Sequence, residues 1–294
     1  MFYRRKVILS ILEVFNGNLN KIALQKLLFL FTQRQNKKAY DFVPYKFGCY
    51  SFSAAADISA MITKGLITED DKTYTKINQS NYVFTLEPDD KKILLELKTL
   101  YNDYNAERLI KHTYINYPYT AINSIIANRL LNPEQQQKIT LARPTTNNIV
   151  LFTIGYEGIS LEEYFNRLIK NDVKVLVDVR NNPLSMKFGF SKTLLQKFCA
   201  NLSIQYIHYP EVGIQSEQRQ ELNTQQDYDK LFALYRKNNL VKTVPTQNTI
   251  LALLKQHNRI ALTCFEANIC QCHRKHLAES IENLPDFKYE IKHI

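Results

Sequence analysis

Apolar residues in the first part of the chain recur every three or four positions, which is the spacing of a helix with one buried face. Three stretches have this spacing, with apolar residues at Val7, Ile8, Ile11, Leu12 and Phe15, at Ile22, Leu24, Leu27, Leu28 and Phe31, and at Ala54, Ile58, Met61 and Ile62. Gly65 predicts the end of the third helix, because glycine readily adopts the backbone conformation that stops one. Residues 67–88 then predict two short strands around a polar turn.

The pattern changes near residue 149, where short apolar runs begin to alternate with amphipathic stretches. The apolar runs predict strands at residues 149–158, 173–180, 204–210, 259–268 and 287–294. The amphipathic stretches predict helices at residues 160–171, 191–202, 248–258 and 272–284, the first with Ser160 as its N-cap. Such alternation is typical of a mostly parallel, Rossmann-like sheet with helices on both faces. The predicted fold class is therefore α/β, preceded by an α-rich N-terminal part.

A polar segment with one proline, ARPTTNN at residues 142–148, separates the two patterns. Three helices followed by a hairpin is the element order of a winged helix. LQKLLFLF (24–31), YDFVPYKFGCYS (40–51) and ISAMITKGLI (58–67) resemble the winged-helix-like domains that precede various bacterial effector domains. We therefore predict a winged-helix-like domain at residues 1–88, a helical connector and linker at 89–148, and an α/β domain at 149–294.

The chain carries 38 Lys and Arg against 28 Asp and Glu, a formal net charge of +10. A basic surplus favours a polyanionic partner, so we expect nucleic acid or a nucleotide. The basic residues that could contact DNA in the N-terminal domain are Arg4, Arg5, Lys6, Lys37, Lys38, Lys46 and Lys64. The alternative is a protein-docking or dimerisation domain with solvated basic residues. The sequence does not indicate an oligomeric state.

No apolar run approaches the roughly 20 residues that a membrane-spanning helix needs. The N-terminus resembles a first helix rather than a signal peptide, because no small-residue cleavage site follows it. The number of cysteines, 5, is odd, and together with the missing export signal it favours a reducing compartment. We therefore expect a cytoplasmic protein without a membrane partner.

Ionisable and glycine residues gather at the predicted carboxyl ends of four strands. They are Gly155, Tyr156, Glu157 and Gly158 after the first strand, Asp178 and Arg180 at the second, His208 and Glu211 at the third, and Cys264 and Glu266 at the fourth. Ligands of open parallel sheets bind outside the carboxyl ends of the strands. The sequence therefore predicts a functional site at this edge.

Five segments, TIGYEG, VDVRNNPLSMKFGFSK, YIHYPEVG, LTCFEANICQCHR and IKHI, resemble in order and spacing the bacterial family called domain of unknown function 488. The resemblance covers residues 149–294. The positions that match its motifs are Gly155, Tyr156, Asp178, Arg180, Pro183, Ser185, Phe190, Lys192, His208, Pro210, Gly213, Cys264, Glu266, Cys272, His273 and Arg274. Val212 departs from the pattern, since leucine is more usual there. The resemblance implies an α/β fold and a location for the site, but no reaction.

The segment CFEANICQCHRKHL at residues 264–277 holds three of the five cysteines. Its C-x5-C-x-C-H spacing is not one of the usual zinc spacings, so we expect no metal ligands here. A second interpretation is a nucleophilic thiol at Cys272, with its pKa lowered by a helix N-terminus and His208 as its partner. The favoured interpretation is an anion site, in which this helix N-terminus, Arg180 and Arg274 hold a phosphate.

The predicted function is an enzyme that acts on nucleic acid or a nucleotide by hydrolytic, base-modifying or N-glycosidic chemistry, within a bacterial defence or mobile-element locus. The predicted catalytic residues are Asp178, His208, Glu266, Cys272 and His273. The predicted substrate- and phosphate-binding residues are Gly155, Tyr156, Glu157, Arg180, Lys187, Lys192 and Arg274. The cofactor is unknown, although the carboxylates could hold Mg²⁺. The alternative function is a non-catalytic sensor of a phosphorylated ligand, coupled to a winged-helix regulator.

Overall fold

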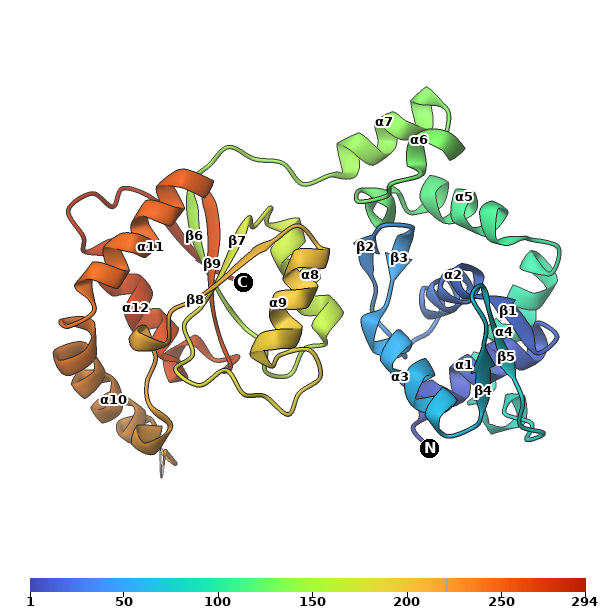
Figure 1. Cartoon of the computed structure of the whole chain (residues 1–294), viewed down its shortest axis with the longest axis horizontal. Coiled ribbons are helices and arrows are strands. Elements are labelled where there is room, and N and C mark those ends of the chain that lie inside the picture. The colour runs from blue at the N-terminus through green and yellow to red at the C-terminus, as the bar shows by residue number, and fades with distance from the viewer. Residues whose placement is uncertain (220–221) are drawn as a thin grey trace. The chain divides into compact units, whose positions relative to one another are not determined.

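The computed structural model describes residues 1–219 and 222–294 and divides the chain into two compact units. Unit 1 is Met1–Arg143 and unit 2 is Pro144–Ile294 (Figure 1). Each unit has its own hydrophobic core. Among the described residues, no helix combines the length and the apolar character needed to cross a membrane.

Unit 1 begins with three helices and a small antiparallel sheet. Its first elements are α1 (Tyr3–Val14), β1 (Asn18–Asn20), α2 (Lys21–Thr32), β2 (Val43–Tyr45), β3 (Gly48–Tyr50), α3 (Phe52–Thr63), β4 (Ile67–Glu69) and β5 (Thr73–Lys76). Strand β5 lies between β1 and β4 and is antiparallel to both, whereas β2 and β3 form a separate hairpin. The three predicted helices and the two strands after them are confirmed. Gly65 follows α3 with φ +66°, the left-handed conformation expected at a helix end.

The helices of the predicted connector share the core of unit 1. The elements are η1 (Val83–Thr85), α4 (Pro88–Tyr101), α5 (Ala106–Asn116), η2 (Pro118–Ala121), α6 (Ala127–Leu130) and α7 (Pro133–Ala142). Leu94 and Leu97 of α4 and Leu109 of α5 lie in the same buried cluster as Leu24 and Leu28 of α2. Helices α4 and α5 therefore complete the N-terminal core rather than linking two domains.

Unit 2 contains a five-stranded, all-parallel sheet. Its strands are β6 (Val150–Gly155), β7 (Val175–Asp178), β8 (Gln205–His208), β9 (Arg259–Cys264) and β10 (Glu290–His293), in the spatial order β10-β6-β9-β7-β8. All five predicted strands are confirmed, although each is shorter than its predicted range. Strands β6, β7 and β9 are buried along their whole length, which explains their continuous apolar sequences.

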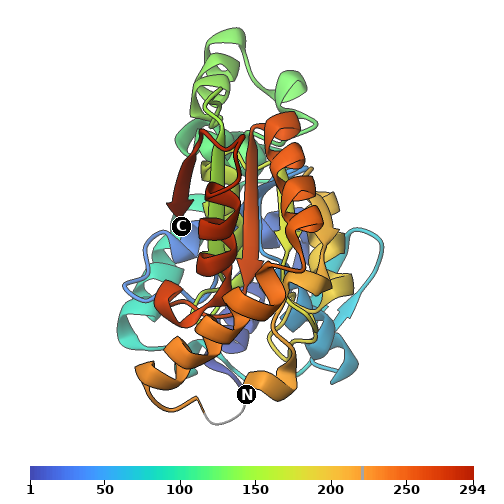
Figure 2. The ribbon, with the colours of Figure 1, turned by 90° about the vertical axis from the view of Figure 1, so that its left-hand side faces the viewer.

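Helices cover both faces of this sheet (Figures 1 and 2). They are α8 (Leu161–Lys170), α9 (Lys192–Asn201), α10 (Gln225–Leu234), α11 (Val244–His257) and α12 (His273–Glu282), with the π-helical η5 (Tyr235–Leu240) and the 3-10 turns η3 (Pro210–Val212), η4 (Ser216–Arg219) and η6 (Ile269–Gln271). Val175 and Val177 of β7 pack in one buried cluster with α11 and α12. Helices α8 and α9 lie on the other side of the sheet in Figure 1. Ser160 caps α8 as predicted, whereas α10 and η5 were not predicted.

Candidate functional site

The carboxyl ends of four strands of unit 2 lie along one edge of the sheet. The register places Gly155 of β6 opposite Cys264 of β9. On the other side of β9, Asp178 of β7 lies opposite Thr263, and it also pairs with His208 of β8. Side chains separated by more than a hundred residues in sequence are thereby brought to the same edge.

Asp178 and Arg180 form a buried ion pair at the end of β7. Asp178 is 0% exposed and Arg180 is 6% exposed. One carboxylate oxygen of Asp178 accepts from Arg180 Nε at 2.8 Å and from its backbone N–H at 3.1 Å. The other accepts from Arg180 Nη2 at 2.5 Å and from the Tyr206 hydroxyl at 2.7 Å. Both oxygens of Asp178, a predicted catalytic residue, thus bind groups of the protein itself.

Arg180 uses its remaining donors to join two loops. Its Nη1 donates to the Tyr156 hydroxyl and to the Phe190 carbonyl, each at 2.8 Å. The Tyr156 ring stacks on the Phe190 ring with centroids 4.2 Å apart. Burial alone would lower the pKa of Arg180, but hydrogen bonds to Asp178 and its negative charge raise that pKa above its ordinary value. Arg180 is thus a permanent cation neutralised inside the protein, which differs from the predicted phosphate grip.

Three other predicted site residues have different surroundings. His208 and Lys187 hold backbone carbonyls, and Lys192 is exposed. His208 Nε2 donates to the Arg180 carbonyl at 2.8 Å. Lys187 Nζ donates to the Tyr156 carbonyl at 2.6 Å, and burial lowers the pKa of this lysine. Lys192 is exposed on the first turn of α9. These side chains fix the loops or face solvent, and they do not converge on one ligand.

Arg274 and Glu157 hold the loop that follows β9. Arg274 is 2% exposed and donates to the carbonyls of Glu266 and Ala267 at 2.5 and 3.3 Å. Glu157 accepts from the Ala267 N–H at 2.9 Å. Gly155 is required at the end of β6, because a Cβ there would collide with the Glu266 carbonyl. Arg274, Glu157 and Gly155 therefore shape the loop, which is a different task from the predicted contact with substrate.

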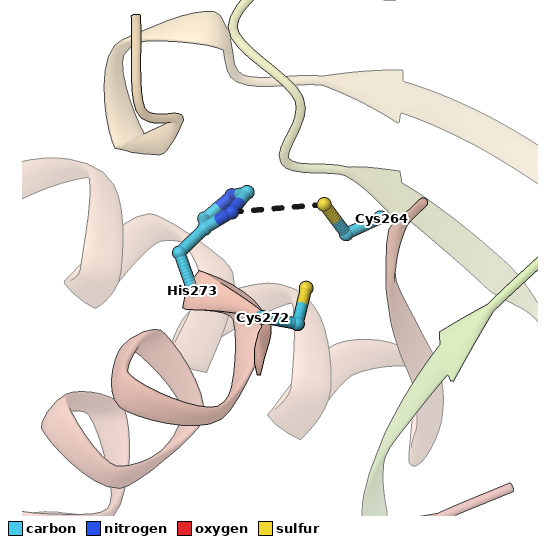
Figure 3. A group of neighbouring side chains, drawn as sticks. All are labelled: Cys264, Cys272 and His273. Atoms are coloured by element: carbon cyan, nitrogen blue, oxygen red, sulfur yellow. Dashed lines mark hydrogen bonds between the residues drawn. The ribbon is translucent and has the colours of Figure 1, made fainter. Parts of the chain in front are cut away.

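Cys264, Cys272 and His273 converge at this edge (Figure 3). Their sulfur and ring-nitrogen atoms all lie within 4.8 Å of one another, and all three residues are buried. Cys264 Sγ lies 3.6 Å from His273 Nδ1 and donates to Glu266 Oε2 at 3.1 Å. His273 Nε2 lies 3.0 Å from the Val179 carbonyl and donates its proton there. The Nδ1 lone pair therefore points toward the thiols.

Cys272 and His273 reach the same place because Cys272 precedes α12. Its backbone is extended, with φ −128° and ψ 132°, and α12 begins at His273. The sequence argument placed both residues in the helix, where neighbours point apart. The structure therefore brings together three possible metal ligands in a segment where the sequence predicts none.

The Cys272 thiol is not activated by its helix. Burial, followed by hydrogen bonding with Cys264, raises the pKa of Cys272 well above its ordinary value. The expected lowering at a helix N-terminus is therefore outweighed. In this environment the thiol keeps its proton at neutral pH.

A pocket of about 330 Å³ opens beside the cluster, and Cys264 and His273 form part of its wall. The loop after β7 contributes Asn181 and Asn182, and the loop after β9 contributes Phe265, whose side chain is 42% exposed. The sequence analysis missed these three residues. Their position directly after Arg180 and Cys264 was the available signal, because strand-end loops line such pockets.

In unit 1, two of the basic residues predicted to contact DNA are engaged by a carboxylate. Arg4 and Arg5 form ion pairs of 2.5 and 2.7 Å with Asp57, which is 2% exposed and also accepts from the Tyr40 hydroxyl. Lys6 is half-buried. The exposed members of the predicted set are Lys37, Lys38, Lys46 and Lys64.

Comparison with known proteins bears on unit 2. A search of curated proteins gave no match. Within unit 2, residues 160–281 match the model of the family described as Domain of unknown function DUF488.

Proposed function

We propose that unit 2 is an enzyme that hydrolyses a bond at the base of a nucleotide unit, either free or within nucleic acid. The observation that carries this proposal is the pocket at the carboxyl edge, whose wall combines a thiol and an imidazole with amides and an exposed aromatic ring. A volume of about 330 Å³ is at the lower end of the range for ligand pockets, which runs from about 300 to 1,000 Å³. That size suits one base with its sugar better than a long oligomer segment.

The base is a better candidate than the phosphate as the recognised group. Arg180, the arginine of the pocket wall, donates to protein oxygens, and Arg274 directs its Nη1 to the Glu266 carbonyl. Asn181 and Asn182 supply amides, which can pair with the polar edge of a base, and Phe265 supplies a ring on which a base can stack. A neutral, planar, hydrogen-bonding ligand therefore fits this wall.

Glu266 is the proposed general acid–base, and His273, whose Nε2 proton is held by the Val179 carbonyl, is a fixed part of the adjoining cluster. Glu266 is partly exposed and its Oε2 lies 3.1 Å from Cys264 Sγ, so a carboxylate stands at the edge of the thiol–imidazole cluster. A carboxylate in this place can take a proton from attacking water and return it to the leaving group. Asp178, Arg180 and His208 position the loops, and Cys272 is not used as a nucleophile.

We propose further that residues 1–88 are a winged-helix-like module that contacts nucleic acid. The order of α1, β1, α2, α3, β4 and β5 and the sheet order β1-β5-β4 support it. Unit 1 has 20 Lys and Arg against 13 Asp and Glu, a surplus of seven, while unit 2 has 18 against 15. Helix α3 has no Lys or Arg from Phe52 to Thr63, so the proposed phosphate contacts come from exposed lysines outside it.

The alternative function, a sensor of a phosphorylated ligand, is less well supported. Such a sensor needs cations directed at its ligand. In the described part of the pocket wall, the one arginine is Arg180, whose charge is neutralised by Asp178. The sensor hypothesis would be favoured only if a phosphorylated ligand bound unit 2 without being turned over.

Turnover of nucleosides, nucleotides and oligonucleotides by the full chain tests the enzymatic proposal. Mass spectrometry should detect release of ammonia or of free base from one class of substrate. Glu266→Gln should reduce the rate by at least about 100-fold, the usual scale of general acid–base catalysis. Glu211→Gln, at an exposed position of the turn η3, is the matched control and should keep the wild-type rate. Equal rates in the two variants would remove Glu266 from the mechanism.

DNA binding by the full chain tests the proposal that residues 1–88 contact nucleic acid. The apparent affinity should fall steeply with salt, with a slope of about −0.9 per phosphate contact for duplex DNA. K46E/K64E should lower both the affinity and the slope. The control K111E/K138E changes the net charge by the same amount at two other exposed positions of unit 1. It should lower the affinity and the slope less than K46E/K64E does. Equal losses would indicate a nonspecific effect of charge, and no binding at low salt would contradict the proposal.

A further inference from the structure

We propose that Cys264, Cys272 and His273 are the ligands of a Zn²⁺ ion. The cluster lies in the wall of the pocket to which the enzymatic proposal refers, but the argument for the metal rests on the geometry of the three side chains. Their donor atoms come from two separate parts of unit 2: the end of β9 and the start of α12. Soft thiolate and imidazole donors in this combination favour zinc among the common biological metals.

The spacing of the donor atoms suits tetrahedral coordination. With Zn–S near 2.3 Å and Zn–N near 2.0–2.1 Å, sulfur and nitrogen on neighbouring corners of a tetrahedron lie about 3.6 Å apart. Cys264 Sγ and His273 Nδ1 are separated by 3.6 Å. Cys272 Sγ lies within 4.8 Å of both, close to the spacing of a third corner.

His273 is already held in the tautomer that a metal requires. Its Nε2 proton goes to the Val179 carbonyl at 3.0 Å, which leaves the Nδ1 lone pair facing Cys264 Sγ, 3.6 Å away (Figure 3). Zinc-binding histidines generally donate the other ring N–H to a carbonyl or carboxylate in this way, because the hydrogen bond fixes the ring.

The fourth coordination position is on the side of the pocket. Cys264 and His273 both belong to the pocket wall, and Glu266 Oε2 lies 3.1 Å from Cys264 Sγ. Three protein ligands with a position open to a cavity is the arrangement of catalytic zinc sites, whereas structural sites have four protein ligands. The ion would therefore supply a Lewis acid at the place where the proposed substrate binds.

Binding has a definite proton balance. A thiol binds Zn²⁺ as a thiolate, so formation of two Zn–S bonds from two thiols displaces about two protons to solvent. The Nε2 proton of His273 stays hydrogen-bonded to the Val179 carbonyl, because the metal would bind Nδ1.

Metal binding by the full chain, stripped with a chelator and kept reduced, tests the site. Zn²⁺ alone is titrated by calorimetry in two buffers of different ionisation enthalpy, and Co²⁺ alone is titrated by absorbance. We expect about one ion per chain, release of about two protons, and the absorption bands of tetrahedral thiolate-bound cobalt. C264S and C272S should lose stoichiometric binding. C270S, which removes the exposed thiol of the same segment, should bind as the wild type does.

Circular dichroism shows whether the metal-free wild-type chain is folded. The test then does not depend on whether the variants fold. A stripped chain that retains its spectrum and takes up no zinc would overturn the proposal, as would equal uptake by the wild type, C264S and C272S. Failure of the metal site is distinguishable from failure of the enzymatic proposal. A folded, stripped chain that takes up no zinc but turns over a nucleotide substrate would sink only the former, and stoichiometric zinc without turnover of any nucleotide substrate would sink only the latter.

Discussion

At the scale of single residues, the Asp178–Arg180 pair shows how a motif at a strand end can serve structure. Residues i and i+2 of a strand point to the same face, so an aspartate and an arginine with this spacing can pair with each other. Here the Asp178 carboxylate accepts four hydrogen bonds, three from Arg180 and one from Tyr206. Arg180 also joins the loops that carry Tyr156 and Phe190, so the pair fixes the positions of both loops.

Asp178→Asn should destabilise unit 2 strongly, because it leaves the Arg180 charge buried without its counter-ion. We expect the free energy of unfolding of unit 2 to fall by about 3–5 kcal/mol. Hydrogen exchange of the β7 amides measures this loss separately from unit 1. Glu211→Gln should change it by less than about 0.5 kcal/mol, as is usual at exposed sites. A stable D178N protein without turnover would instead identify Asp178 as a catalytic group.

Lys26 gives a pH-dependent prediction in unit 1. Its side chain is 1% exposed, donates to the Cys49 carbonyl at 2.9 Å, and has its pKa lowered by burial. Between this lowered pKa and the unfolded value of about 10.4, the unfolded chain binds more protons, so stability rises with pH. Relative to Lys26→Met, the wild type should therefore gain free energy of unfolding from about pH 7 to about pH 9.5, below the range where lysine and tyrosine of the unfolded chain titrate fully. Urea unfolding at both pH values measures it, and a constant difference between the proteins would contradict the lowered pKa.

At the scale of elements, the start of α12 decides what the cysteines can do. Because Cys272 is extended and precedes the helix, its thiol turns into the protein beside Cys264. Cys270 lies in η6, only two residues earlier, and is exposed. Helical periodicity cannot register this difference, since it arises from the irregular turn between β9 and α12.

Thiol alkylation under native conditions should therefore be selective. Of the five cysteines, Cys270 is exposed and the other four are buried, so one fast modification per chain is expected. Mass spectrometry of digested protein locates it, and C270S should abolish it. Rapid labelling of Cys272 in metal-free protein would show that its thiol is accessible and ionised, contrary to the raised pKa.

Element boundaries and element types were accessible from the sequence to different degrees. Every predicted strand of the parallel sheet exists, because runs such as VKVLV are long enough to identify a strand buried on both faces. The sequence did not predict helix α10 and η5, because residues 225–240 are mostly polar and lack a clear apolar stripe. The pattern of hydrophobic and polar positions identifies elements that are buried against the core. It gives no signal for a helix that is mostly exposed.

At the scale of the whole molecule, the sequence could predict which edge of the sheet carries the site but not how its charges are used. Strand order and direction bring Gly155, Asp178, His208 and Cys264 together, and that follows from alternation alone. Whether Arg274 faces a ligand or the Glu266 carbonyl depends on the path of an irregular loop. The predicted residues therefore gather at the predicted edge, where Arg274 and Glu157 hold a loop and Asn181, Asn182 and Phe265 line the adjoining pocket.

The central claim is that the pocket beside Cys264 and His273 receives the base of a nucleotide unit, and a crystal structure of the full chain soaked with nucleosides tests it most directly. We predict a base stacked against Phe265, hydrogen-bonded to the amides of Asn181 or Asn182, with its reacting carbon on the Cys264 and His273 side of the pocket. Glu266 lines the neighbouring pocket, and its Oε2 lies 3.1 Å from Cys264 Sγ. A base bound elsewhere on unit 2, or a pocket that stays empty at saturating nucleoside, would contradict it.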